Sequence, residues 1–175
     1  LWRDAVVINY GEGGREMRTD AGNAYTKSEI WKTCLKDAAG LDVVTVMLGT
    51  NDARYIRNDQ WDAYSDGMFK ASAQTIAEAL RRKNPDMKIL FLSSPEIFEE
   101  RDGTVGGAIR AIVGSQKGIP EFLEAKGLTV DFFDMNALLQ NAEYTKPDGI
   151  HLTVEGLAYF ARQLAPVIEK TYFAH

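Results

Sequence analysis

Short apolar runs that alternate with helix-forming segments are the feature that most constrains the fold of this chain. Four runs are rich in β-branched or aromatic residues and are expected to form strands: 6–8, 43–48, 88–92 and 128–133. The segments between them have helical spacing of apolar residues or residues that start and stop helices. This regular alternation predicts a parallel sheet with helices on both faces, which is a three-layer α/β/α architecture.

The expected helices lie between these runs and after the last of them. In chain order they cover residues 28–39, 61–82, about 107–127, 136–140 and 154–172. Ser28 is a favoured N-cap residue and Gly40 a favoured terminator, so they predict the two ends of the first helix. Gly118 and Pro120 are expected to interrupt the third helix, and Pro166 to kink the last.

Composition narrows the class of protein. The 175 residues carry a net charge of −5, which argues against a protein that binds nucleic acid, because such proteins present a basic face. The single cysteine excludes a disulfide within the chain, and the presence of only two histidines argues against a multi-histidine metal site. No apolar run approaches the ~20 residues of a membrane span. The length fits one domain.

The loops at the carboxyl ends of the strands are where a parallel α/β sheet binds its ligands. In this chain they are 11–18, 49–54, 93–101 and 144–152. The last of them holds Asp148 three residues before His151. A carboxylate at that spacing can orient an imidazole and stabilise its protonated form, as in the orienter and base of a hydrolase triad. The alternative is a plain turn, because Pro147, Asp148 and Gly149 are common turn residues.

Two further loops carry candidate hydrogen-bond donors. In the segment Gly49-Thr50-Asn51-Asp52, the Asn51 amide could donate to a developing oxyanion, and Asp52 could cap or brace the loop. The glycine-rich segment 11–14 would let backbone N–H groups approach a ligand closely. It lacks the spacing and the Gly-Lys-Ser/Thr ending of phosphate-binding loops. For each of these segments a tight turn is the alternative.

Taken in order, the three loops resemble the sequence blocks of the SGNH (GDSL-type) hydrolases. Residues 7–15 resemble the glycine-bearing second block, 47–52 the third block and 148–156 the fifth. The resemblance implies a flavodoxin-like parallel sheet of strand order 2-1-3-4-5 in a single domain over residues 1–175. It also implies an ester hydrolase that needs no metal or other cofactor. The stretch 11–52 is most similar to the branch that acts on acetylated carbohydrates.

The resemblance further implies a role for each matching residue. His151 would be the general base and Asp148 its partner. Asn51 and the backbone N–H of Gly14 would form part of the oxyanion hole, with Gly13 in place of Gly14 if the register is one residue off. A secreted or periplasmic location is compatible with the family, and the residues themselves do not fix the compartment.

The first block of the family, a strand followed by Gly-Asp-Ser, has no counterpart in the sequence, although that block carries the nucleophile. Of the six serines, none stands in Gly-Asp-Ser or in Gly-x-Ser-x-Gly. Ser93 and Ser94 follow a predicted strand, and we interpret them as wall or turn residues. The first strand is internal in the family sheet, so its loss would leave buried backbone groups unpaired, at about 1–3 kcal/mol each. We therefore expect the domain to be N-terminally incomplete.

Three explanations are open at this point. An N-terminal segment outside these 175 residues could belong to the protein, a separate or cleaved chain could complete the sheet, or the fold could be remodelled without hydrolase activity. The first is favoured because the rest of the site pattern is intact. The leading hypothesis is a serine-dependent esterase that deacetylates a small-molecule or carbohydrate ester. The alternative is a non-catalytic interaction module or assembly subunit, since a fold does not fix a function. A flavodoxin-like nucleotide or flavin binder would leave Asp148 and His151 unexplained.

Overall fold

The sheet at the centre of the molecule is parallel. The structure, a computed structural model, describes residues 5–98 and 105–173. Within these residues the strands are β1 (Val43–Val46), β2 (Lys88–Leu92) and β3 (Asp131–Phe133), in the order β1-β2-β3. Val44 pairs with Ile89 of the neighbouring strand, and Phe91 pairs with Phe132. This order agrees with the last three strands of a flavodoxin-like sheet, so the predicted α/β class is confirmed.

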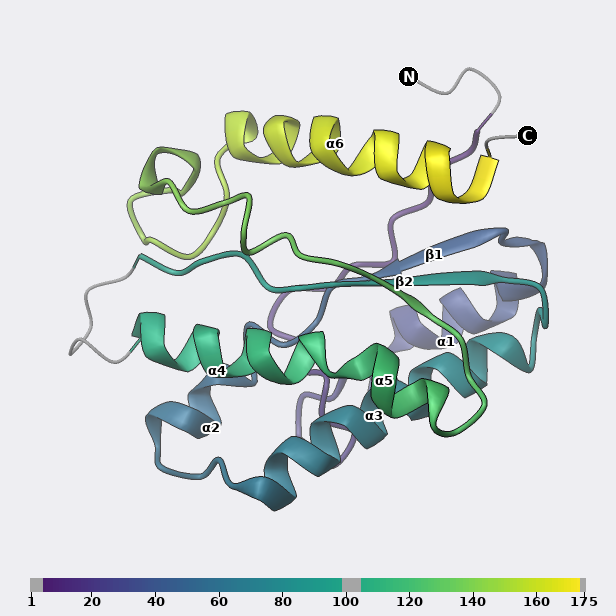
Figure 1. Cartoon of the computed structure of the whole chain (residues 1–175), viewed down its shortest axis with the longest axis horizontal. Coiled ribbons are helices and arrows are strands. Elements are labelled where there is room, and N and C mark those ends of the chain that lie inside the picture. The colour runs from purple at the N-terminus through teal and green to yellow at the C-terminus, as the bar shows by residue number, and fades with distance from the viewer. Residues whose placement is uncertain (1–4, 99–104, 174–175) are drawn as a thin grey trace.

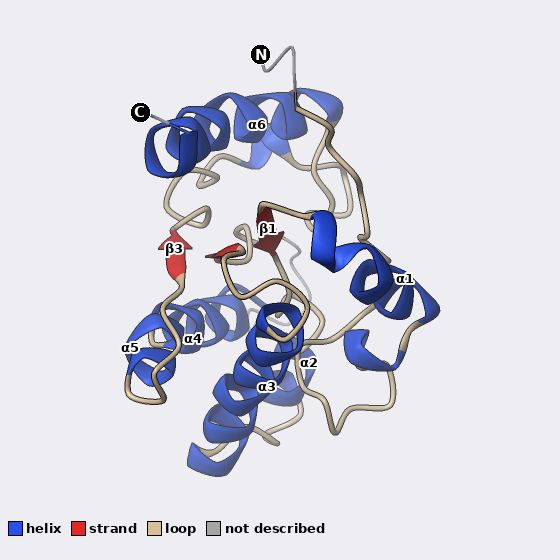
Figure 2. Cartoon of the chain, turned by 90° about the vertical axis from the view of Figure 1, so that its right-hand side faces the viewer, coloured by secondary structure: helices blue, strands red, loops and turns tan. Residues whose placement is uncertain are grey.

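Helices cover both faces of this sheet. Their bounds are α1 (Glu29–Asp37), α2 (Ala53–Arg57), α3 (Ala63–Arg81), α4 (Val105–Lys117), α5 (Ile119–Glu124) and α6 (Val154–Ile168). In Figures 1 and 2, α6 covers one face, and α3, α4 and α5 cover the other. Figure 2 shows α1 beside the outer edge of β1. Among the helices of the described residues, none has the length and apolar character to cross a membrane.

Side-chain caps fix where three of the helices begin. The Ser28 hydroxyl accepts a hydrogen bond from the backbone N–H of Trp31 at the start of α1, as predicted. Asp62 caps α3, and Thr153 caps α6. Each cap satisfies a backbone donor that the first turn of a helix cannot pair internally. The start of α6 directly follows the loop that holds Asp148 and His151, so this cap also fixes the exit of that loop.

The core lies on both sides of β2. Ile89 and Phe91 point toward α3 and α4 and belong to the larger apolar cluster, which includes Phe69 and Ile112. Leu90 and Leu92 point the other way and form a smaller cluster with Ile168. Alternate residues of a strand face opposite sides of a sheet, so a strand that is apolar on both sides must be covered on both faces. Strand β2 is therefore the central strand of the three.

The prediction of a strand at residues 6–8 was wrong. Residues 5–10 have no regular secondary structure, and the exposed fractions of Val6 and Val7 are 87% and 80%. A strand is stabilised by a ladder of hydrogen bonds to a neighbour, and β1 makes its ladder with β2. Apolar composition alone therefore gives no strand here, because residues 6–8 form no ladder with the free edge of β1. The sheet of the described residues therefore has three strands rather than four.

The remaining differences are local. The predicted helix at 136–140 is a turn, and the loop at 49–60 contains the short helix α2. The stretch before Gly127 is divided at Gly118 into α4 and α5, as expected. Helix α6 contains Pro166 and continues as a π-helical turn over Glu169–Phe173. Proline has no N–H to donate, which weakens the regular α-helical pattern near it. Residues 99–101 of the predicted loop 93–101 lie outside the described residues.

Candidate active site

The predicted pair of Asp148 and His151 forms in the structure. The Nδ1 atom of His151 lies 2.9 Å from Oδ2 of Asp148. The other carboxylate oxygen, Oδ1, accepts hydrogen bonds from the backbone N–H groups of His151 and Ile150, both at 2.9 Å. These donors, that of His151 first, lower the pKa of Asp148 to about 2. An ionised carboxylate thus holds Nδ1, which leaves Nε2 as the ring nitrogen that can accept a proton.

Backbone hydrogen bonds give the loop of this pair its shape. Gly149 has a φ of 68°, in the left-handed region that favours glycine. The N–H of Lys146 donates to the carbonyl of His151 at 2.7 Å, which closes the turn. The N–H of Phe98 donates to the carbonyl of Gly149 at 2.7 Å. Because Phe98 lies on the loop that follows β2, this last bond ties the Asp148 and His151 loop to the carboxyl edge of the sheet.

Asn51 joins the two loops that carry the predicted oxyanion donors. Its Nδ2 donates to the carbonyl of Arg15 at 2.9 Å. An amide nitrogen carries two hydrogens, so one can still be donated to a ligand. Gly14 has a φ of 78° and lies in an exposed turn one residue before Arg15. The structure therefore places Gly14 and Asn51 on adjoining loops, and among the described residues neither of them forms a hydrogen bond with His151.

A groove of about 1850 Å³ runs along the edge of β1 that does not pair with β2. One wall is residues 5–13 and another is the inner side of α6, while Trp31 and Ile76 contribute to its floor. His151 and Gly13 both line this groove. Gly14 and Asn51 are not among its lining residues. Of the two glycines that the resemblance offers for the oxyanion hole, Gly13 is the one that shares a cavity with His151.

The serines after β2 take part in structural hydrogen bonds. Ser93 is buried; its hydroxyl donates to Asp134 at 2.8 Å and accepts the N–H of Asn136, also at 2.8 Å. Ser94 is buried too, and its hydroxyl bonds to Gln116. Ser93 and Asp134 therefore hold the backbone N–H groups of Asn136 and Ala137 in the turn that follows β3. These contacts also agree with the interpretation of both serines as wall residues.

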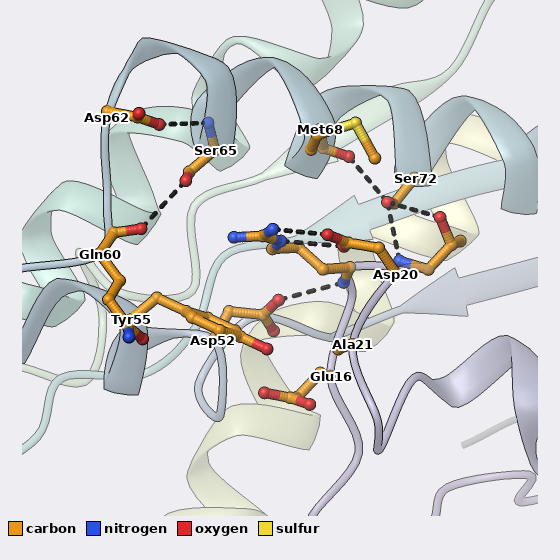
Figure 3. Close-up of polar contacts among 12 residues, drawn as sticks. Glu16, Asp20, Ala21, Asp52, Tyr55, Gln60, Asp62, Ser65, Met68 and Ser72 are labelled. Carbon is orange, nitrogen blue, oxygen red and sulfur yellow. Dashed lines mark hydrogen bonds and ion pairs between the residues drawn. The ribbon is translucent and has the colours of Figure 1, made fainter. Parts of the chain in front are cut away.

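A second, buried polar cluster lies at the loop 15–19, and the sequence predicted only part of it. Asp52 and Glu16 are both fully buried, and Figure 3 shows them with the residues around them. The Asp52 carboxylate accepts the backbone N–H groups of Met17 and Arg18 at 2.9 and 3.1 Å, so it braces this loop. Glu16 accepts a hydrogen bond from Arg54 at 3.0 Å. Nothing in the sequence around Glu16 distinguishes it from a surface carboxylate.

These features define a class of protein. The fold is a three-layer α/β/α sandwich, and a hydrogen-bonded pair of an aspartate and a histidine lies on a loop at the carboxyl edge of its sheet. A family model of GDSL-like lipases and acylhydrolases matches residues 2–159. The chain belongs to this family. A search among curated proteins finds no match.

Three solved structures are similar in fold. A carbohydrate acetylesterase family member from Sinorhizobium meliloti has a TM-score of 0.58 and 22% identity, over 90% of this chain and 75% of that one. A putative GDSL-like lipase from Parabacteroides merdae has a TM-score of 0.62 and 16% identity, over 87% and 68%. A peptidoglycan O-acetylesterase has a TM-score of 0.54 and 21% identity, over 78% of this chain. The match spans 40% of the length of that esterase.

Proposed function

We propose that this chain is part of a serine-dependent ester hydrolase that removes acetyl groups from a carbohydrate. Its nucleophilic serine comes from a segment outside these 175 residues. The observation that carries the proposal is the hydrogen-bonded pair of Asp148 and His151 at one end of the groove along β1. The pair is the base and orienter of a triad, and the groove is where the third member can enter.

The shape and lining of the groove favour an extended strand as the carrier of the serine. The unpaired edge of β1 presents backbone donors and acceptors that a parallel strand would satisfy. The walls are apolar on both sides, with Val6 and Val7 on one side and Leu157 and Phe160 on the other. Such walls suit a strand that is apolar on both faces. A strand parallel to β1 ends at the carboxyl edge of the sheet, which is the edge that holds His151.

The reaction then follows the chemistry of a serine acyl transfer. The serine oxygen bonds to the ester carbonyl carbon while Nε2 of His151 takes its proton, and Asp148 stabilises the imidazolium. The oxyanion accepts hydrogen bonds from Nδ2 of Asn51 and the backbone N–H of Gly14, or of Gly13 in the alternative register. The bond to the sugar oxygen breaks, and His151 returns the proton to that oxygen. A water molecule then gives a proton to His151 and bonds to the acyl carbon. The bond to the serine oxygen breaks, acetate leaves, and His151 passes the proton to the serine oxygen.

A resemblance in sequence and a similarity in fold support a carbohydrate ester as the substrate. The stretch 11–52 is most similar to the family branch that acts on acetylated carbohydrates. Two of the structures with a similar fold are named as a carbohydrate acetylesterase family member and a peptidoglycan O-acetylesterase. The side chain of His151 is 72% exposed, so a hydrated sugar could reach it.

A fluorophosphonate probe, which reacts with activated serines, tests the proposal on the native protein that contains this chain. We expect the labelled peptide to carry a serine outside the 175 residues. We also expect His151→Ala to abolish both labelling and acetyl-ester hydrolysis, whereas the matched control His175→Ala retains them. A label on any of the six serines of the chain would contradict the proposed source of the nucleophile. Full activity of His151→Ala would contradict the function itself.

A non-catalytic module is the second candidate, and the buried, bonded state of Ser93 and Ser94 favours it over a serine from within the chain. In that case the groove would still take a strand, but neither labelling nor hydrolysis would occur in the native protein. The same probe experiment therefore separates the two candidates.

A further inference from the structure

Asp52 braces a distant loop and does not cap the helix that it precedes. It occupies the N-cap position of α2, yet its side chain makes no capping hydrogen bond to that helix. Its two oxygens instead accept the N–H groups of Met17 and Arg18, which lie 35 and 34 residues earlier in the chain. Asp52 therefore fastens the loop 15–19 to the start of α2, directly beside Asn51.

The loop 15–19 is held at two further points. The carbonyl of Arg15 accepts the Asn51 amide at 2.9 Å. The N–H of Thr19 donates to the hydroxyl of Ser72 on α3 at 3.0 Å (Figure 3). Gly14 directly precedes this loop, so the position of its N–H relative to Asn51 depends on how residues 15–19 are held. The two bonds to Asp52 are the central attachment.

The buried charge of Asp52 makes this attachment costly. Burial raises the pKa of Asp52 to about 6, and the neighbouring Glu16 carboxylate acts in the same direction. The two backbone N–H donors oppose that rise and do not cancel it. The guanidinium groups of Arg18 and Arg54 are the cations that interact with Asp52. A buried carboxylate that is held at such a cost is more often found where a protein needs a fixed geometry for function.

We propose that Asp52 is a positioning residue of the oxyanion hole, which holds residues 17 and 18 so that the N–H of Gly14 and the amide of Asn51 converge on one oxygen. This inference rests on the proposed function, since it presumes that these two groups stabilise an oxyanion. Asp52 acts through the loop and touches neither substrate nor nucleophile. Its removal should therefore lower the rate of the acyl-transfer step and leave ground-state binding almost unchanged.

The variant Asp52→Asn in the native protein tests this inference. An asparagine keeps the shape but offers one acceptor oxygen, so one of the two loop bonds is lost. We expect kcat per probe-reactive serine to fall by about 10- to 100-fold, with KM changed by less than about 2-fold, since a displaced donor loses part of the stabilisation it gives. Amide hydrogen exchange at Met17 and Arg18 should become faster. The matched control is Asp20→Asn, because Asp20 binds the side chain of Arg18 and not its backbone; its kcat should equal that of the wild type.

The possible results separate this inference from the function on which it rests. If the wild type is active and the kcat of Asp52→Asn equals that of the wild type, the positioning role is overturned and the proposed function stands. An inactive wild-type protein would overturn both. If Asp52→Asn fails to fold, Ser72→Ala takes its place, because it removes the contacts of the Ser72 hydroxyl to Thr19 and otherwise costs only a bond to the carbonyl of Met68 within α3. We then expect a 2- to 5-fold lower kcat, with an unchanged value overturning the inference.

Discussion

Asp148 and Asp52 have similar hydrogen-bond partners, yet their pKa values are shifted in opposite directions from that of an ordinary aspartate. Each carboxylate accepts two backbone N–H groups. The pKa of Asp148 is lowered to about 2, mainly by those donors, whereas burial raises the pKa of Asp52 to about 6. Asp148 is exposed to water and bonds to residues two and three positions away, while Asp52 is buried and bonds across more than thirty residues. Burial, rather than the number of hydrogen-bond donors, decides whether the pKa of the carboxylate rises or falls.

The largest effect expected from this difference is on catalysis at Asp148. Asp148→Asn should lower kcat on the order of 10³-fold through loss of the oriented base. The midpoint of urea unfolding should fall only slightly, because solvent screens the charge of this exposed carboxylate. Steady-state hydrolysis of an acetyl ester by the native protein, together with urea denaturation, measures both quantities. The exposed Asp86→Asn serves as the control and should change neither. An unchanged kcat for Asp148→Asn would show that His151 works without its partner.

A second test concerns the backbone that leads to Asn51. Gly49 has a φ of 131°, and a Cβ there would lie 2.7 Å from Nε2 of Gln116 and 2.9 Å from Cγ2 of Ile112. Gly49→Ala should therefore lower the free energy of unfolding by about 2–4 kcal/mol, from strain and overpacking together. Gly67→Ala is the control, because no atom lies within 4 Å of its added Cβ and it is in α3; it should be neutral or stabilising. Equal stabilities of the two variants in urea would refute the close packing at Gly49.

The third prediction is the pH dependence that follows from Asp52. Its pKa rises from an ordinary 3.8 to about 6 on folding. The folded state then binds more protons than the unfolded state between these values, so the stability of the wild type falls as pH rises through this window. Asp52→Asn lacks this ionisation. The free energy of unfolding of the variant, relative to the wild type, should increase between pH 4 and pH 7 by on the order of 2–3 kcal/mol. A constant difference across that range would contradict the burial of a charged Asp52.

The same contrast explains what the sequence could and could not predict. Asp148 and His151 are three residues apart, so a short motif places them in contact, and the apolar runs at 43–48 and 88–92 predict the paired strands. Residues 6–8 have an equally apolar sequence, but pairing depends on a neighbour that no local pattern reveals. The bonds from Asp52 to Met17 and Arg18 likewise depend on which loops the fold brings together. The turn at 136–140 is held by bonds from its backbone to Ser93 and Asp134, and helical spacing does not detect these bonds.

The smallest expected effect, and the sharpest test of the comparison, is the titration of Asp148 itself. The largest cause of its low pKa is the backbone N–H of His151, and the imidazole ring ranks below both backbone donors. In ¹³C NMR of the side-chain carboxyl, the wild-type midpoint should lie near pH 2. His151→Ala keeps the backbone N–H, so its midpoint should rise only part of the way toward 3.8. Because the folded pKa is lowered, the contribution of Asp148 to stability is present above pH 3.8 and is lost as pH falls toward 2. A midpoint at the ordinary value in His151→Ala would mean that the ring, and not the loop backbone, holds the carboxylate ionised.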